Sequence, residues 1–262
     1  MNWNKKKDIF ALMTGHGQSL DGSWDSGCVY GKYTEASLCQ NITKYACKYL
    51  RQSGVKVISD SDNKNNKNMV ACVEWANEKK AKRYMSVHCD YAGATKGVYP
   101  LYLTSDGLKM AKTVGKSVAK QMDMKYKGAC RRTDLYELNA TTMPAVIFET
   151  GAIKADLAKL KQAKKYGKAL AKAICIYIGI DFVESWGIIL PKRGYFQSGD
   201  EGSNVKALQR FLNNQGFDCG EEDGIYGKKT ISAVKRFQRR YALEADGLFG
   251  IESLRKADSL LS

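Results

Sequence analysis

The chain has only two histidines, and each lies at the end of a short apolar run. His16 follows the run 8–14 and stands between two glycines, and His88 follows the run 83–87. Short apolar runs bounded by turn residues are typical of strands buried on both faces of a parallel sheet. Open α/β sheets bind their ligands at the carboxyl ends of such strands. We therefore expect both imidazoles to reach the same edge of one sheet.

A third apolar run, 144–148, ends in the carboxylate of Glu149. A glutamate at the end of an apolar strand is costly unless it is paired or functional, because burial disfavours an isolated charge. Two imidazoles and one carboxylate are the ligand set of many zinc hydrolases, which leave a fourth position to water. The pattern indicates a metal centre at which a further carboxylate handles protons.

The third metal ligand must be an acidic residue that returns to the same edge of the sheet. Glu35 fits, because it opens the helix expected after the loop that follows the first strand. Asp25 and Asp21, within that loop, are competitors. Glu149 is then the residue placed to accept a proton from the water on the metal.

Each assignment has a structural alternative. A histidine after a strand is often a hydrogen-bonded structural residue, and Glu35 can serve only to favour the helix dipole. Glu149 can cap the following helix or pair with a lysine. The restriction of histidine to two positions, both at the ends of buried runs, favours the metal site.

Composition is that of an ordinary globular protein, with 44% hydrophobic and 26% charged residues in a chain of 262. The apolar runs are too short to cross a bilayer, so no integral membrane segment is expected. The basic start lacks the apolar stretch and cleavage site of a signal peptide, which predicts an unsecreted amino terminus. Eight cysteines without CxxC spacing favour reduced thiols over a disulfide framework or a thiolate zinc site.

The positive charge is concentrated before residue 183. That part holds 30 basic and 16 acidic residues, whereas 12 basic and 11 acidic residues follow, so it carries +14 of the net charge of +15. A charge of this size attracts polyanions, of which nucleic acid and the anionic polymers of a bacterial wall are two candidates.

Strand and helix signals alternate through this part, which predicts an α/β fold with a mainly parallel, twisted sheet flanked by helices. Pro100 argues for an outer position of its strand. A short strand is also expected at 135–138. The expected longer strands lie at 8–14, 55–59, 83–88, 97–104 and 144–149, and the expected helices at 34–54, 69–80, 105–121 and 156–179.

The remainder of the chain predicts a small all-α domain. Two turns, Asp223–Gly227 and Asp246–Gly250, share the pattern Asp-Gly-aliphatic-aromatic-Gly, which indicates an internal duplication. We therefore expect a catalytic domain at 1–182, a linker at 183–196 and a helical domain at 197–262.

Four motifs, taken in order, resemble those of the type-3 zinc-dependent N-acetylmuramoyl-L-alanine amidases over about residues 7–180. They are Thr14-Gly-His-Gly17 with Asp25-Ser-Gly27, then Glu35, then Ser86-Val-His88, and finally Met143-Pro-Ala-Val-Ile-Phe-Glu149-Thr-Gly151. The resemblance implies that His16, Glu35 and His88 hold zinc and that Glu149 is the acid/base. Two departures are Asp90, where the family usually carries Asn, and Ser59-Asp60, where its second strand often ends in Thr-Arg.

The tail resembles a three-helix peptidoglycan-binding module. Its Tyr226 and Phe249 are candidate walls of a binding groove or, alternatively, core residues that hold the repeated turns. The matching positions include Gly202, Val205, Leu208-Gln209, Gly224, Tyr226-Gly227, Thr230, Phe237-Gln238 and Asp246-Gly247.

Together these features predict zinc-dependent hydrolysis of the amide between N-acetylmuramic acid and L-alanine, in a phage or prophage endolysin. Such an enzyme is made in the host cytoplasm and acts on the wall after release. The expected partners are peptidoglycan and anionic wall polymers rather than nucleic acid, and the oligomeric state stays open. The alternatives are a host autolysin, a zinc peptidase or carboxypeptidase acting on stem peptides, and a non-catalytic polyanion-binding protein.

Overall fold

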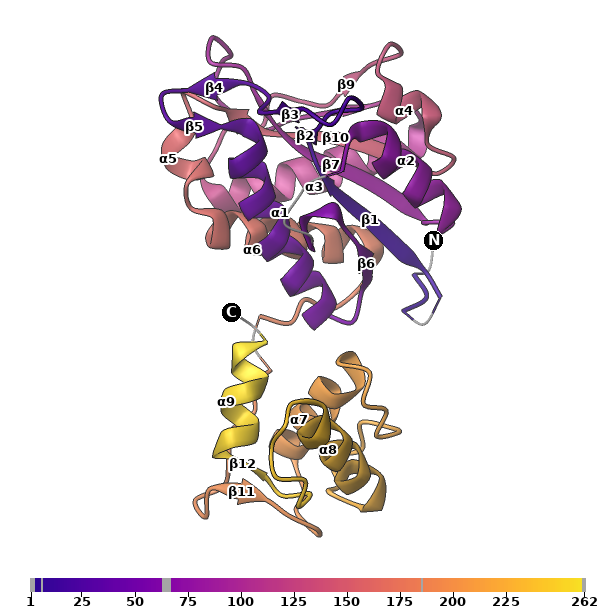
Figure 1. Ribbon diagram of the computed structural model, residues 1–262, viewed down its shortest axis with the longest axis vertical. Coiled ribbons are helices and arrows are strands. Elements are labelled where there is room, and N and C mark those ends of the chain that lie inside the picture. Colours follow the sequence, from indigo (N-terminus) through magenta and orange to yellow (C-terminus); the bar gives the residue numbers. More distant parts are fainter. Residues whose placement is uncertain (1–2, 6, 63–66, 185, 261–262) are drawn as a thin grey trace. The chain divides into compact units, whose positions relative to one another are not determined.

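The computed structural model describes residues 3–5, 7–62, 67–184 and 186–260. It divides the chain into two compact units, Met1–Phe182 and Val183–Ser262, and each is described here by itself (Figure 1). Within the described residues, no helix combines the length and the apolar character that crossing a membrane requires.

The first unit, within its described residues, is built on a six-stranded sheet (Figure 1). In spatial order its strands are β6 (Lys56–Ile58), β1 (Ile9–Thr14), β7 (Arg83–Asp90), β10 (Ala145–Ala152), β8 (Tyr99–Tyr102) and β9 (Cys130–Arg131). All neighbours are parallel except β8 and β10. The predicted, mainly parallel sheet is confirmed. Among the described residues, only the two-residue β9 lies outside β8, the strand that carries Pro100.

Both faces of the sheet are buried, and alternate side chains of each central strand pack into different cores. In β1, Phe10 and Leu12 join one core, whereas Ala11 and Met13 join another. The first core also contains side chains of α1 (Glu35–Gln52), α3 (Ser105–Met122) and α6 (Ala163–Ile178). The second contains those of α2 (Met69–Glu78) and α4 (Tyr136–Ala140). Helices therefore flank the sheet on both faces.

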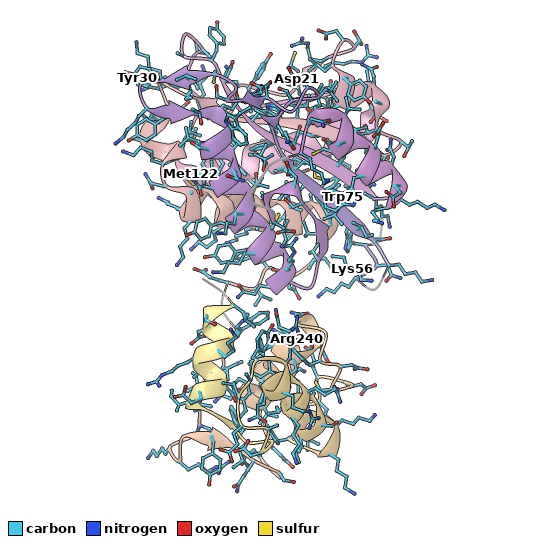
Figure 2. The ribbon with its side chains drawn as sticks, viewed as in Figure 1. Asp21, Tyr30, Lys56, Trp75, Met122 and Arg240 are labelled. Carbon is cyan, nitrogen blue, oxygen red and sulfur yellow. The ribbon has the colours of Figure 1, made fainter. Side chains whose placement is uncertain are left out.

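Side-chain positions follow this layering (Figure 2). Met122 is fully buried at the end of α3, whereas Lys56 extends into solvent from the edge strand β6. At the start of α1, the hydroxyl of Thr34 accepts a hydrogen bond from the backbone N–H of Ser37 at 3.3 Å. The predicted cap is confirmed, and it fixes Glu35 in the first turn of the helix.

Two predicted elements are wrong in detail. Residues 135–138 do not form a strand, because Tyr136–Ala140 is the helix α4, in which Leu135 and Leu138, three residues apart, both pack on the sheet. The single helix expected at 156–179 is two helices, α5 (Leu157–Leu160) and α6. Asp156 is instead held by the backbone: its carboxylate accepts from the N–H groups of Gly97 and Ala152 at 2.9 and 3.0 Å.

The second unit contains α7 (Ser203–Asn214), α8 (Lys228–Arg240) and α9 (Ile251–Ser259). A short antiparallel ladder joins β11 (Tyr195–Phe196) to β12 (Phe249–Gly250). The segment 183–196 lies in this unit. Its Trp186 is buried against Phe211, with ring centroids 4.9 Å apart, so this part of the expected linker contributes to the core of the second unit.

The internal duplication is visible as a repeated hydrogen-bond network. Gln209 on α7 donates to Asp223 at 2.7 Å, and Gln238 on α8 donates to Asp246 at 2.8 Å. In both repeats the side-chain carbonyl of the glutamine accepts from the N–H of the glycine that follows the aspartate. The two turns are therefore held by the same contacts.

The aromatic residues of the repeated turns are core residues. Tyr226 and Phe249 both have 0% of their surface exposed. The hydroxyl of Tyr226 also donates to the carbonyl of Gly247 at 2.8 Å, which ties the first turn to the second. The alternative expectation, that these rings wall an open groove, is wrong because neither ring reaches the surface.

Candidate metal centre

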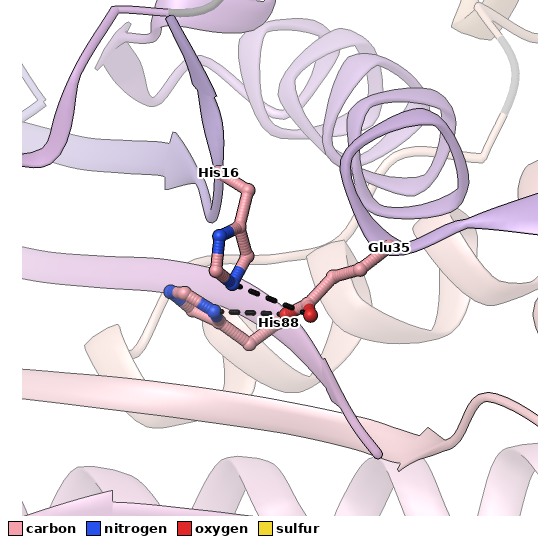
Figure 3. A group of neighbouring side chains, drawn as sticks. All are labelled: His16, Glu35 and His88. Carbon is pink, nitrogen blue, oxygen red and sulfur yellow. Dashed lines mark hydrogen bonds and ion pairs between the residues drawn. The ribbon is translucent and has the colours of Figure 1, made fainter. Parts of the chain in front are cut away.

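His16, Glu35 and His88 come together at the carboxyl edge of the sheet (Figure 3). His88 belongs to β7, His16 follows β1, and Glu35 is the first residue of α1. The Nε2 atom of His16 lies 3.3 Å from Oε2 of Glu35, and Nδ1 of His88 lies 3.0 Å from Oε1. One ligand atom from each residue lies within 4.8 Å of the others. The three residues singled out from the sequence are thus gathered at one point.

Glycines make this approach sterically feasible. A Cβ atom on Gly15 would lie 2.3 Å from Cε1 of His88, and one on Gly27 would lie 2.6 Å from His16 and 2.7 Å from Glu35. His16 itself has a φ of 63°, an uncommon and costly conformation for a residue with a side chain. The glycine-rich motif therefore gives the imidazoles room as well as turning the chain.

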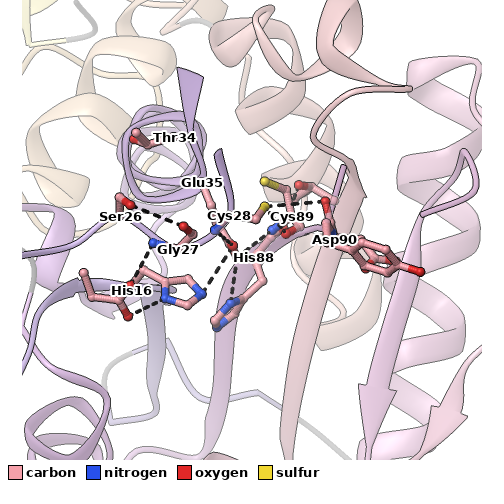
Figure 4. Close-up of polar contacts among 12 residues, drawn as sticks. His16, Ser26, Gly27, Cys28, Thr34, Glu35, His88, Cys89 and Asp90 are labelled. Carbon is pink, nitrogen blue, oxygen red and sulfur yellow. Dashed lines mark hydrogen bonds and ion pairs between the residues drawn. The ribbon is translucent and has the colours of Figure 1, made fainter. Parts of the chain in front are cut away.

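The carboxylate of Glu35 is buried and held in place by the backbone (Figure 4). Its Oε2 accepts from the N–H of Cys28 and its Oε1 from the N–H of Cys89, both at 3.1 Å. Burial by itself raises the pKa of Glu35, but the hydrogen bonds and charges of His16 and His88 outweigh it and hold the pKa well below its usual range. Glu35 is therefore an anion that faces two imidazole nitrogens.

The competitors of Glu35 take other positions. Asp25 accepts a hydrogen bond from Nδ1 of His16 at 2.7 Å, on the side of the ring away from Glu35. Asp21 accepts from the backbone N–H and the hydroxyl of Ser23. Spacing along the sequence left these three carboxylates open as ligands, and the structure places only Glu35 of the three between both histidines.

The donor set fits a catalytic zinc ion. Two imidazole nitrogens and one carboxylate oxygen are typical zinc ligands, and three protein ligands leave a position for water or substrate. Cys28 and Cys89 also lie beside Glu35, and their thiols form a second possible group with it. Hydrogen bonding to Cys89 together with burial raises the pKa of the Cys28 thiol far above its usual range.

Glu149 lies next to the cluster, on β10 directly opposite His88 in the parallel register. The two residues share a sheet face, since Ile147 and Tyr84, two and four residues earlier on their strands, lie in the same core. Within the described part of the chain, its Oε2 is buried and without a hydrogen-bond partner. Burial raises the pKa of Glu149 to about 7, with the charge of His88 opposing the rise. A carboxyl group of this kind suits proton transfer near neutral pH.

Sequence reasoning missed Glu137, which the structure brings to the same place. This residue of α4 has only 5% of its side chain exposed. Its Oε1 accepts from the hydroxyl of Tyr84 at 2.6 Å, and its Oε2 lies 3.5 Å from Nε2 of His88. The one available signal was an acidic residue between two leucines that become buried on the sheet, at Leu135 and Leu138.

A cleft of about 530 Å³ opens beside the two histidines. The loop 14–21 forms one wall, Asn68, Met69 and Val70 at the start of α2 form another, and His88 and Glu137 also line it. A metal held by the two histidines would therefore lie beside this cleft.

The two departures from the expected motifs also have structural roles. Asp90 lies 3.4 Å from the ammonium group of Lys127, which stands 4.7 Å above the ring of Tyr99. Asp60 accepts a hydrogen bond from the backbone N–H of Thr14 at 2.9 Å and so supports the end of β1, just before His16.

Comparison with known proteins identifies the family of the chain. Residues 11–179, more than half of the chain, match the N-acetylmuramoyl-L-alanine amidase family. The chain belongs to this family. Residues 201–256 match a peptidoglycan binding domain, as expected from the motifs of the tail.

Individual relatives are similar over shorter stretches. The amidase CwlM of Mycobacterium tuberculosis is 44% identical over 54 residues, which are 21% of this chain and 13% of CwlM. The amidase CwlL of Bacillus licheniformis is 37% identical over 67 residues, 23% of this chain and 19% of CwlL. These alignments thus span less than a fifth of either relative.

The fold is also that of solved amidases. The structure of the N-acetylmuramoyl-L-alanine amidase AmiC2 of Nostoc punctiforme superposes with a TM-score of 0.59 at 24% identity. The match covers 66% of this chain and 98% of that structure. The architecture of the first unit is therefore that of an amidase catalytic domain.

Proposed function

We propose that this chain hydrolyses the amide bond between N-acetylmuramic acid and L-alanine in bacterial peptidoglycan, with a zinc ion held by His16, Glu35 and His88. The observation that carries the proposal is the meeting of these three side chains beside an accessible cleft. Membership of the amidase family supports the choice of substrate. Bound zinc would polarise the scissile carbonyl and lower the pKa of a coordinated water to about 7.

Glu149 is the proposed general base and acid. Its carboxylate stands on the strand next to His88, and burial keeps its pKa close to neutrality. It accepts the proton of the attacking water and delivers it to the leaving amine of alanine. The hydrogen bonds from the backbone to Glu35 hold the ligand carboxylate still during this transfer.

Wall attachment is assigned to two features. The second unit, whose residues 201–256 match a peptidoglycan binding domain, supplies specific binding. The first part of the chain carries a net charge of +14 and supplies long-range attraction to anionic wall polymers.

Product analysis of digested sacculi by mass spectrometry tests the proposed reaction. An amidase releases stem peptides with a new amino-terminal alanine and leaves the glycan strands intact. New termini elsewhere in the peptide would indicate a peptidase, and new reducing ends would indicate a glycosidase. The matched control is Glu149→Gln, which is nearly isosteric: it should keep zinc while hydrolysis falls by about 10²–10⁴-fold. Full activity of this variant would assign the base to another carboxylate, of which Asp90 is the first to test.

We propose further that the chain acts as a phage or prophage endolysin, made in the host cytoplasm and acting on the wall after release. The pairing of an amidase unit with a wall-binding unit supports this role. The same pairing would also suit a host autolysin, so an experiment has to separate the two roles. Production inside bacteria with and without a co-expressed holin separates the two. An endolysin lyses the cells only when the holin opens the membrane, whereas lysis without the holin would favour an autolysin.

A further inference from the structure

The two histidines of the metal centre turn different nitrogens toward Glu35. For His16 this atom is Nε2, and for His88 it is Nδ1. A neutral imidazole that binds a metal through one nitrogen carries its proton on the other. The remaining nitrogens are Nδ1 of His16 and Nε2 of His88, and each needs an acceptor to fix the ring.

Each of these nitrogens faces a carboxylate. Asp25 lies 2.7 Å from Nδ1 of His16, and Glu137 lies 3.5 Å from Nε2 of His88. Acceptors of this kind fix the tautomer and the orientation of metal-bound histidines, and they raise the basicity of the ligand nitrogen. The two carboxylates differ in environment, because the side chain of Asp25 is 49% exposed and that of Glu137 is 5% exposed.

Glu137 is itself fixed by a buried partner. Tyr84, with 0% of its surface exposed, donates its hydroxyl proton to Oε1 of Glu137 at 2.6 Å. Tyr84 precedes His88 by four residues on β7, so both side chains project from the same face of the sheet. The helix α4 brings Glu137 onto that face, where Oε1 accepts from Tyr84. Its Oε2 lies 3.5 Å from Nε2 of His88, a buried nitrogen that has no hydrogen-bond partner among the described residues.

We propose that Glu137 is the positioning residue of His88, and that Tyr84 holds Glu137 for this purpose. The carboxylate accepts the Nε2 proton of His88 and thereby commits Nδ1 to the metal. Asp25 does the same for His16 with the nitrogens exchanged. The inference rests on the metal centre of the proposed function, and it predicts that the two histidines adopt opposite tautomers in the zinc-loaded protein.

Zinc affinity, measured by competition with a chromophoric chelator, is the first test. Glu137→Leu removes the acceptor and should weaken zinc binding by about 10–100-fold. Tyr84→Phe removes one hydroxyl and should weaken it by about fivefold, the worth of one hydrogen bond. Because Tyr84 acts through Glu137, the double variant should bind zinc no more weakly than Glu137→Leu alone. Thermal unfolding followed by circular dichroism checks that each variant folds. If Glu137→Leu does not fold, the zinc affinity of Tyr84→Phe is the test.

The imidazole signals in ¹⁵N NMR spectra are the second test, and they are simple because the chain has only two histidines. In the zinc-loaded wild type, His88 should show a protonated Nε2 and His16 a protonated Nδ1. Glu137→Leu should expose the Nε2 proton of His88 to fast solvent exchange and leave the signal of His16 unchanged. The matched control, Asp25→Asn, should disturb His16 and spare His88.

The outcomes separate this inference from the proposed reaction. Wild-type protein that binds zinc, shows opposite tautomers and loses affinity in the Glu137 and Tyr84 variants supports the inference, even if it hydrolyses no peptidoglycan. Undiminished zinc affinity in both variants overturns it, whatever the activity. Metal bound through Nε2 of His88, or no zinc binding by the wild type, also overturns it.

Discussion

Replacement of Asp60 by asparagine tests how the chain supports the end of the strand before His16. Asp60 is fully buried, and its Oδ1 accepts from the N–H of Thr14 at 2.9 Å. Its Oδ2 is buried without a hydrogen-bond partner among the residues that the structure describes. Burial is the largest influence on this carboxyl group and raises its pKa from 3.8 to about 6, although hydrogen bonds from the backbone oppose the rise.

The shift sets both the size and the sign of the expected effect. Between pH 3.8 and about 6 the folded protein keeps a proton on Asp60 that the unfolded chain has lost. The free energy of unfolding therefore falls as the pH rises through this window. A shift of roughly two pKa units corresponds to about 3 kcal/mol, a cost that is absent at lower pH and complete at higher pH.

Asp60→Asn should remove this dependence, because the amide carries no charge and its oxygen still accepts from Thr14. Urea unfolding of the full chain, with a chelator present to exclude metal binding, measures the difference between variant and wild type. Relative to wild type, the free energy of unfolding of the variant should rise by about 3 kcal/mol between roughly pH 4 and pH 7.5. Asp62→Asn is the matched control, since Asp62 is 42% exposed and pairs with Arg51. A difference that stays constant with pH would show that Asp60 ionises without the cost of burial.

Three further outcomes follow from the site and the charge distribution. Purified protein should contain about one zinc per chain by atomic emission, and His16→Ala and His88→Ala should each lose it; retention of zinc by both would rule out the site. Gly15→Ala should weaken zinc binding while circular dichroism stays unchanged, because its Cβ would lie 2.3 Å from the ring of His88. In sacculus pull-downs, the binding of residues 1–182 should fall with salt, whereas that of residues 183–262 should persist. If the fragment 183–262 sediments with sacculi at no salt concentration, it has only a structural role.

Much of the candidate metal centre could be predicted from the sequence because its elements are locally encoded. The central strands are buried on both faces, so each can be recognised in the sequence as an apolar run that ends abruptly. His16, His88 and Glu149 each end or follow such a run, and the parallel sheet brings them to one edge. The helix cap at Thr34 is likewise a local signal.

The sequence did not decide between contacts that depend on the path of the chain in three dimensions. Glu35 was the preferred third ligand by spacing, but Asp25 and Asp21 stayed open as competitors, and the start of α1 at the sheet edge placed Glu35 between the histidines. In the second unit, the glycine pattern revealed the duplicated turns, but only the packing showed that Tyr226 and Phe249 are buried.

Glu137 shows the same limit most clearly. Its stretch of sequence has no strong helical or strand period, and residues 135–138 were predicted as a strand. Its role follows from contacts with Tyr84 and His88, which lie 53 and 49 positions earlier in the chain. A local pattern records which residues share a strand or a helix face, because the periods of two and 3.6 residues are properties of the backbone. Which carboxylate meets which imidazole depends instead on how helices and strands pack, and the tertiary structure alone decided it.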